Sequence, residues 1–230
     1  MVSLASSVSI NVYLKLKPKN QIAQLITEFT QFLEQKGVLN QYQISPFISH
    51  YPLHITLYLT DYESKQIPKI MEQVQTIAKL QKPLWVSSSE FSLKNKAYLM
   101  LSVNRTGELD TLSKTTLAAL VELRDKNAAI PVWASADKDR QELFKQYGSP
   151  NVLDFFNPHF SVLGPVNLDP QSTAALTNTL QHFIKVFSTK QQTGSLAKAY
   201  ALGVGLADAQ GQIVKELSVF PFHYTKKKNR

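Results

Sequence analysis

Pro52-Leu53-His54-Ile55-Thr56-Leu57-Tyr58-Leu59 places a histidine and a threonine two positions apart within an apolar run, and Pro158-His159-Phe160-Ser161-Val162-Leu163 repeats the pattern with a serine. Side chains alternate between the two faces of a strand, so each histidine shares a face with its hydroxyl residue. The apolar face explains why such a strand is buried, whereas the polar face needs a separate reason. We interpret the two stretches as one active site built from two similar halves.

A single His-x-Ser/Thr triplet is a weak signal. With 5 histidines in 230 residues, roughly one such triplet is expected by chance. The sequence contains three, and the third, His223-Tyr224-Thr225, runs directly into a lysine cluster without a following apolar residue. We attribute that third copy to chance. The first two share an apolar residue directly after the hydroxyl residue, Leu57 and Val162.

Composition indicates a folded protein with anionic partners. The chain is 43% hydrophobic and 18% charged, and its 230 residues suit a single domain of two lobes sharing a core. The formal net charge of +8 favours phosphates or nucleic acid as partners, although part of the surplus lies at residues 226–230.

Several classes are disfavoured. The absence of cysteine excludes disulfides, thiolate nucleophiles and cysteine-based zinc sites. No apolar run approaches the length of a spanning helix, and residues 1–9 lack the basic start and apolar core of a signal peptide. We therefore expect a cytoplasmic monomer without membrane contact. A mature exported protein, its leader removed, would have the same features.

Apolar periodicity and turn residues predict an α+β fold. The expected strands cover residues 9–16, the first motif, 84–93, 96–103, the second motif, 197–207 and 213–222, and the expected helices cover 21–36, 67–80, 109–124, 138–147 and 172–187. The order motif strand, helix, strand, strand thus occurs twice. We expect two pseudo-symmetric lobes of antiparallel strands with outer helices, 1–125 and 157–230, joined by segment 126–156. Central motif strands would then face each other across a cleft between the lobes.

Two histidines across a cleft suit general acid–base catalysis, because imidazole gives and takes protons near neutral pH. One deprotonates an attacking water while the other protonates the leaving oxygen. The hydroxyls of Thr56 and Ser161 would donate hydrogen bonds to phosphate oxygens, on which charge accumulates during the displacement.

Competing chemistries fit the sequence less well. No Asp or Glu stands two or four residues from either motif histidine in a pattern typical of metal sites. The sequence has no Gly-x-Ser-x-Gly elbow, no phosphate-binding Gly-x-x-x-x-Gly-Lys loop and no dinucleotide fingerprint, so we expect neither metal nor cofactor. Gly203-Val204-Gly205 lies within an expected strand and indicates a bulge or close packing.

At His54-Ile55-Thr56 and His159-Phe160-Ser161, the chain resembles the 2H phosphoesterase superfamily, which includes the bacterial 2′,5′-RNA ligase-like proteins. That family carries one His-x-Thr/Ser motif in each lobe of a pseudo-symmetric α+β fold. The resemblance implies metal-independent cleavage of phosphodiesters, such as 2′,3′-cyclic phosphates, 2′–5′ linkages or RNA 3′ ends. It also implies that His54 and His159 are acid and base and that Thr56 and Ser161 hold the phosphate.

Residues outside the motifs carry weaker signals. Candidate substrate contacts are the aromatic residues Tyr58, Tyr51 and Phe156, for which packing is the alternative. Candidate phosphate contacts are Lys94, Lys96 and Arg105, whose positions equally suit plain solvation. We treat His50 and His182 as structural or exposed.

Two other classes of function remain open. One is a module that binds phosphorylated RNA or nucleotides without turnover. The other is an interaction protein in which both motif histidines are structural. Two intact motifs disfavour the first of these, because binding alone does not require two proton-transfer groups.

Overall fold

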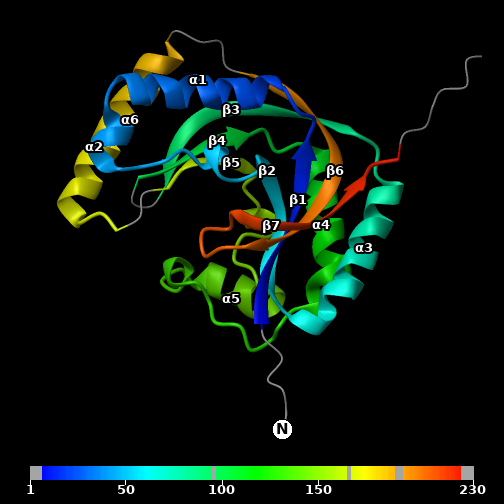
Figure 1. The fold of residues 1–230 in the computed structure, drawn as a ribbon. Helices are drawn as coiled ribbons and strands as arrows, with labels where there is room; N and C mark the ends of the chain where they lie inside the picture. The colour runs from blue at the N-terminus through cyan, green and yellow to red at the C-terminus, as the bar shows by residue number, and fades with distance from the viewer. Residues whose placement is uncertain (1–6, 95–96, 165–166, 190–193, 224–230) are drawn as a thin grey trace, which may run out of the picture.

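The computed structural model describes residues 7–94, 97–164, 167–189 and 194–223 (Figure 1). It is an α+β fold built on antiparallel strands. The strands are β1 (Ser7–Leu16), β2 (His54–Glu63), β3 (Leu84–Lys94), β4 (Tyr98–Val103), β5 (His159–Leu163), β6 (Leu196–Ala207) and β7 (Ile213–Pro221). Each expected strand is present within a few residues of its predicted bounds.

The helices of the described part of the chain also match the prediction, with one short addition. They are α1 (Gln21–Gln35), α2 (Val38–Tyr42), α3 (Ile67–Leu80), α4 (Gly107–Leu120), α5 (Lys138–Tyr147) and α6 (Pro170–Ser188). Four of them are capped by a side-chain oxygen that accepts backbone N–H bonds of the first turn; the capping residues are Asn20, Thr106, Asp137 and Asp169. Gly37 follows α1 with a φ of 75°, a left-handed conformation that glycine adopts without strain. The sequence order motif strand, helix, strand, strand occurs twice, as predicted.

The order of the strands corrects the prediction that the motif strands are central. Along the sheet the order is β2-β1-β6-β3-β4-β5, with β7 also paired to β6. The two motif strands β2 and β5 therefore lie at the two ends of this order. They nonetheless contact each other, so the sheet curves until its end strands meet.

Strand pairing also crosses the two halves of the sequence. Strand β1 pairs with both β2 and β6, and β4 pairs with both β3 and β5. Strands of residues 1–125 thus pair with strands of residues 157–230. The pairing leaves two groups of strands, β1, β2, β6 and β7 on one side and β3, β4 and β5 on the other. They are joined where residues 84–87 of β3 pair with β6.

Helices cover the outside of both groups (Figure 1). Helices α3 and α4 pack against each other and on β7 and β2, whereas α1 and α6 lie over β6 and β3. An aromatic cluster joins the second pair of helices to the sheet: the ring centroid of Phe29 lies 4.3 Å from that of Phe91 and 4.7 Å from that of Phe187. Burying these rings fixes the helices on one face, which leaves the opposite face of the strands for the polar motif residues.

A glycine directly after β5 makes room for the turn that precedes β2. A Cβ added at Gly164, directly after β5, would lie 2.5 Å from the ring of Phe47 and 3.0 Å from that of Tyr98. Phe47 belongs to the short turn that leads into β2, and its ring centroid is 5.8 Å from that of Tyr98. Glycine at this position therefore lets the chain before the first motif pack against the strands of the second.

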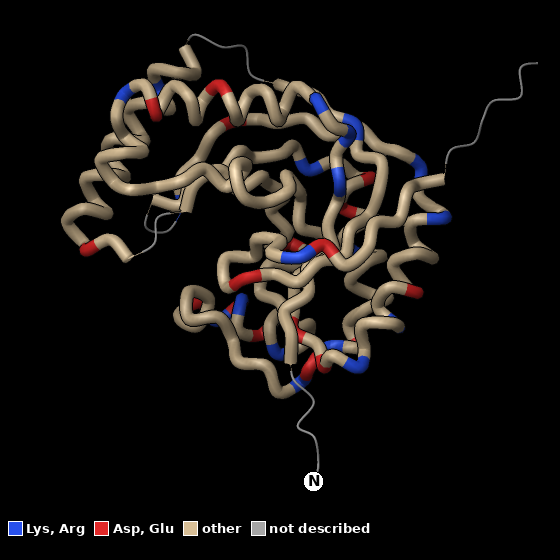
Figure 2. Tube along the Cα trace, viewed as in Figure 1, with Lys and Arg blue, Asp and Glu red and all other residues tan. Residues whose placement is uncertain are grey.

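Charged residues are scattered along the chain rather than collected on one element (Figure 2). All 17 Asp and Glu residues lie in the described part, but six of the 25 Lys and Arg residues do not: Lys96, Lys190, Lys226, Lys227, Lys228 and Arg230. The described part is thus close to neutral, and most of the basic surplus lies outside it. None of the helices in this part has the length and apolar character needed to cross a membrane.

Candidate functional site

His54 is the first residue of β2 and is 7% exposed. Its Nδ1 lies 2.9 Å from the carbonyl oxygen of Pro52. A carbonyl only accepts, so Nδ1 carries the proton and Nε2 is the atom available for proton transfer. The ring also packs edge-on against Tyr13, with centroids 5.4 Å apart.

His159 occupies the same place at the start of β5 and is half-buried. Its Nδ1 lies 2.8 Å from the carbonyl oxygen of Asn157, again two residues earlier in the chain. Nδ1 must therefore donate here as well, and Nε2 is the proton-transfer atom. The two histidines thus share one local geometry, which orients both rings from their own backbone.

Burial lowers the pKa of both imidazoles. For His54, burial is the largest cause and the charge of His159 adds to it, while the Pro52 and Gly211 carbonyls and Asp208 oppose it. For His159, burial again comes first, the Asn157 carbonyl opposes it, and Lys94 lowers the pKa further. The charge of His159 is thus one of the causes that lower the pKa of His54.

Thr56 follows His54 on the same face of β2. Its Oγ1 accepts a hydrogen bond of 2.8 Å from Nδ2 of Asn11, on the neighbouring strand β1. Asn11 is completely buried, and the same Nδ2 donates to the carbonyl oxygen of Gly211 over 3.0 Å. Since Thr56 already accepts, its own hydroxyl proton is left to donate to a ligand.

Ser161 is held in a similar way by other residues. Its Oγ accepts a bond of 2.7 Å from the hydroxyl of Tyr98 on β4, and that hydroxyl accepts one of 3.1 Å from Nε2 of Gln212. A tyrosine hydroxyl has one proton, so with Gln212 donating to it, Tyr98 donates to Ser161. The proton of Ser161 is again left for a ligand.

The two supports occupy equivalent positions in the strand registers. Thr56 lies opposite Tyr13, and its donor Asn11 stands two residues before Tyr13. Ser161 lies opposite Met100, and its donor Tyr98 stands two residues before Met100. Diagonal neighbours of this kind are within reach of long side chains across an antiparallel pair. The local equivalence of the motifs therefore extends to their neighbouring strands.

A glycine provides the space behind His54. A Cβ at Gly203 of β6 would lie 2.2 Å from the Tyr13 ring, whose hydroxyl donates to Glu216 over 2.6 Å. Burial and the adjacent Glu216 raise the pKa of Tyr13 far above its ordinary value, so it stays neutral. The register of β6 against β7 also shifts between Val204 and Gly205. The two features predicted for Gly203-Val204-Gly205, close packing and a bulge, are therefore both confirmed.

A small pocket is lined by one residue of each motif, His54 and Ser161, but not by Thr56 or His159. Residues of both halves line it, together with apolar residues of the turn before β2: Phe47, Ile48, Tyr51, Pro52, Leu53, His54, Ser161 and Gln212. Tyr51, a predicted substrate contact, is therefore at the site. Its ring packs against that of Phe47, with centroids 5.9 Å apart.

Two other predicted substrate contacts are core residues. Tyr58 is 1% exposed and its hydroxyl donates to the carbonyl of Tyr147, away from the motif histidines. Phe156 is 5% exposed and lies beneath the guanidinium of Arg105, 5.6 Å from ring centroid to Cζ. For Tyr58 and Phe156 the structure thus shows packing in the core, which was the alternative to substrate contact.

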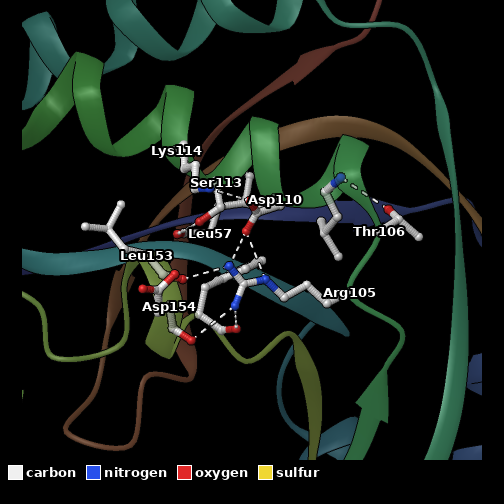
Figure 3. Close-up of polar contacts among 10 residues, drawn as sticks. Leu57, Arg105, Thr106, Asp110, Ser113, Lys114, Leu153 and Asp154 are labelled. Atoms are coloured by element: carbon white, nitrogen blue, oxygen red, sulfur yellow. Dashed lines mark hydrogen bonds and ion pairs between the residues drawn. The ribbon is translucent and has the colours of Figure 1, made fainter.

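Arg105 is exposed, and its guanidinium binds other groups of the protein (Figure 3). Its guanidinium pairs with Asp110, which also binds Lys114 over 2.7 Å, and it donates to the carbonyls of Leu153, Asp154 and Phe156. This network ties the start of α4 to the segment that leads into the second motif. Lys94 is exposed and lowers the pKa of His159, whereas Lys96 lies outside the described residues.

The remaining histidines of the described part do not line this pocket. His50 and His182 are exposed, and each has a ring contact with the next residue, Tyr51 and Phe183. His223 is also exposed, and the rest of the third triplet lies outside the described residues. Among described residues, no three His, Asp or Glu side chains gather as a metal site would require.

No protein-family model matches the sequence, and a search of curated proteins finds no match either. Solved structures do match it along nearly its whole length. The protein TT0787 of Thermus thermophilus shares 15% identity over 93% of this chain and 97% of its own, with a TM-score of 0.56. A phosphoesterase shares 9% identity over 95% and 100%, with a TM-score of 0.51. E. coli LigT complexed with 3′-AMP shares 8% identity over 95% and 100%, with a TM-score of 0.50.

These likenesses show the fold. The chain has the 2H phosphoesterase fold, which confirms the resemblance seen at the two His-x-Thr/Ser motifs. Identities this low carry no residue roles, so the chemistry of the pocket has to be argued from its own geometry.

Sequence reasoning missed three residues of the site: Asn11, Tyr98 and Gln212. Asn11 had one visible signal, since it is a short polar residue in the middle of the apolar run of β1. Tyr98 and Gln212 had none, because a tyrosine at a strand start and a glutamine after a turn are common on any surface. Only the pairing of strands distant in sequence brings them to the motif hydroxyls.

Proposed function

We propose that this protein is a metal-independent phosphodiesterase that hydrolyses 2′,3′-cyclic or 2′–5′ phosphodiester bonds of nucleotides or RNA ends. His54 and His159 are its general acid and base, and Thr56 and Ser161 bind the phosphate. The chain acts as one domain, in which the strand groups of β2 and β5 form two pseudo-symmetric lobes on either side of the substrate.

One observation carries the proposal: the hydrogen bonds of all four motif side chains leave a donor or a proton-transfer atom on each for a ligand. Both motif hydroxyls accept a hydrogen bond from the protein, from Asn11 and Tyr98, and so have their protons left to donate. Both imidazoles donate Nδ1–H to a backbone carbonyl and have Nε2 left for proton transfer. A site of outward donors suits phosphate oxygens.

The chemistry needs both histidines in different protonation states. The neutral imidazole takes a proton from water at Nε2 as the water oxygen attacks phosphorus. The imidazolium gives its Nε2 proton to the leaving oxygen as the bond from phosphorus to that oxygen breaks. Negative charge grows on the non-bridging oxygens meanwhile, and the two hydroxyls stabilise it without reorganising. The product is a phosphomonoester, and the histidines end with their protonation states exchanged.

Three observations favour nucleotides as the substrates. Tyr51 and the apolar residues before β2 line the pocket beside His54 and offer a surface on which a nucleobase can stack. A protein of the same fold, E. coli LigT, has been crystallised with 3′-AMP. Lys94, near His159, adds a positive charge that favours an anionic substrate.

The test is turnover of 2′,3′-cyclic nucleotides, a 2′–5′ dinucleotide and a 3′–5′ dinucleotide in excess EDTA. We expect the wild type to hydrolyse at least one of them. His54→Ala and His159→Ala should each lose about 100-fold or more, the usual contribution of a positioned proton-transfer group. His182→Ala, which removes an exposed histidine of α6, is the matched control and should retain full activity.

Circular dichroism of each variant separates lost chemistry from lost folding. Activity that survives in both folded motif variants would contradict the two-histidine mechanism. Activity that EDTA abolishes would contradict metal independence. Binding of 3′-AMP without turnover of any substrate would instead indicate the non-catalytic binding module.

A further inference from the structure

The turn between β6 and β7 lies at the point where the supports of the two motif hydroxyls meet. Gly211 accepts the amide hydrogen bond of Asn11, the donor to Thr56. The next residue, Gln212, donates to Tyr98, the donor to Ser161. Two successive residues of one turn therefore reach the supports of both motifs.

The turn is itself held firmly. The carboxylate of Asp208 accepts the backbone N–H groups of Gln210 and Gln212, each over 2.9 Å. The backbone of Asp208 also exchanges bonds with Gly211 and Gln212, 2.9 Å and 3.0 Å long. Gly211 has a φ of 81°, a left-handed conformation that suits glycine. These bonds fix where the Gly211 carbonyl and the Gln212 side chain point.

Buried polar groups indicate that this arrangement serves more than packing. Asn11 is 0% and Gln212 2% exposed. The amide oxygen of Asn11 has no hydrogen-bond partner among the described residues, which is a cost that an apolar residue would avoid. A carbonyl only accepts, so Gly211 obliges Asn11 to face it with Nδ2, the atom that also serves Thr56. The Gly211 carbonyl is also one of the groups that raise the pKa of His54.

We propose that the turn at residues 208–212 sets the direction of the hydrogen bonds at both motif hydroxyls, with Asn11, Tyr98 and Gln212 as positioning residues for phosphate binding. In one series of hydrogen bonds, Gln212 donates to Tyr98 and Tyr98 donates to Ser161. In the other, Asn11 donates to Thr56. Each series of hydrogen bonds ends at a motif hydroxyl whose proton is directed at the phosphate. Hydrogen bonds in series strengthen one another. This one turn thereby keeps the hydroxyls of both Thr56 and Ser161 as hydrogen-bond donors to the phosphate.

The inference rests on the proposed function for its ligand, a phosphate ester, but its test does not depend on turnover. The probe is 3′-AMP, and its affinity is measured by titration calorimetry. Tyr98→Phe keeps the ring and removes the donor to Ser161, and Gln212→Met keeps the length and removes the donor to Tyr98. Each should weaken 3′-AMP binding about threefold to tenfold, the usual effect of one hydrogen bond.

A double-mutant cycle distinguishes positioning from general structural damage. If Tyr98 and Gln212 act through Ser161, neither substitution should weaken binding further in a Ser161→Ala background. Both should keep their full effect in a Thr56→Val background. Controls are Tyr62→Phe, a buried tyrosine whose hydroxyl has no partner in the described structure, and Gln210→Met, an exposed glutamine of the same turn. Both should bind 3′-AMP as the wild type does.

Equal losses in the wild-type and Ser161→Ala backgrounds would overturn the inference, as would unchanged affinity in Tyr98→Phe and Gln212→Met or a wild type that does not bind 3′-AMP. These outcomes differ from failure of the proposed function. A wild type that binds 3′-AMP with the predicted coupling but hydrolyses nothing would refute the phosphodiesterase and leave the positioning role supported.

Discussion

The β1–β2 pair and the β4–β5 pair perform the same task with different residues. In each, a strand begins with a histidine whose Nδ1 donates to the carbonyl two residues earlier. In each, the hydroxyl residue two positions later accepts from a side chain diagonally across the pair. The donor is a buried asparagine in the first pair and a half-buried tyrosine in the second. Backbone geometry is thus repeated, whereas the side chains that complete it are not.

The two pairs differ in how the chain enters them. Before the first motif, Phe47 of the preceding turn packs against Tyr98 beside Gly164. Before the second, the guanidinium of Arg105 holds three backbone carbonyls between Leu153 and Phe156. The first histidine is also the more buried of the two. Similar local geometry can therefore be anchored by aromatic packing or by a charged clamp.

The largest effect on activity is expected from removing the motif hydroxyls. Removing each hydroxyl in turn compares the two halves of the site directly. Thr56→Val and Ser161→Ala should each lower kcat/KM by about 100-fold, the usual effect of removing one donor to a developing charge. Initial rates with the best substrate of the panel measure this. Thr76→Val, on the outer helix α3, is the control and should leave the rate unchanged. A loss in only one of the two motif variants would show that the halves are equivalent in geometry but not in function.

The pH dependence of kcat/KM should show that the pKa of each motif histidine lies below its ordinary value of about 6.5. Because burial lowers the pKa of each, we expect a bell-shaped profile with its maximum on the acid side of that value. Initial rates between pH 4 and pH 9, in steps of roughly half a unit, would define both limbs of the bell. A maximum well above neutrality would contradict this assignment.

The same shifts affect stability with a definite sign. Between the lowered pKa values and about 6.5, the folded protein binds fewer protons than the unfolded chain. The free energy of unfolding should therefore fall as the pH falls through this window. Urea titrations at several pH values measure it, and His54→Ala and His159→Ala should each show a weaker fall.

The smallest expected effect is on thermal stability and concerns the clamp before the second motif, which is formed by Arg105 and the carbonyls it binds. Arg105→Met removes the bonds to three carbonyls and should lower Tm by roughly 2–4 °C. Differential scanning fluorimetry measures this. Lys114→Met removes only the more exposed ion pair to Asp110 and should leave Tm nearly unchanged. If both variants had the same Tm as the wild type, the clamp would be dispensable and the two halves would not differ in the way described.

Much of the local structure could be predicted from the sequence. Apolar periodicity and turn residues placed helices and strands to within a few residues of their observed bounds. The His-x-Thr/Ser triplets identified the four motif residues, because alternation along a strand puts such pairs on one face. The error about central motif strands arose because periodicity says which face is buried but not which strand lies beside it.

The roles of single aromatic and basic residues were harder to predict. Tyr58 shares the polar face of its strand with His54 and Thr56 by alternation, yet its hydroxyl donates to Tyr147 in another part of the chain. Arg105 follows a strand end that resembles a solvated position, yet it binds carbonyls 48 to 51 residues away. Such outcomes depend on partners at long sequence separation, which no local pattern contains.

By itself, the sequence determined the fold class, the elements and the two repeated motifs, because hydrophobic alternation, capping and motif spacing are properties of neighbouring residues. Tertiary structure alone decided that β2 and β5 end the strand order and still meet, and that Asn11 and Tyr98 support the hydroxyls. It also brought Gly211 and Gln212 to both supports at once. The physical reason is that a hydrogen bond between strands depends on register across the sheet, which is set only when segments up to 200 residues apart pack together.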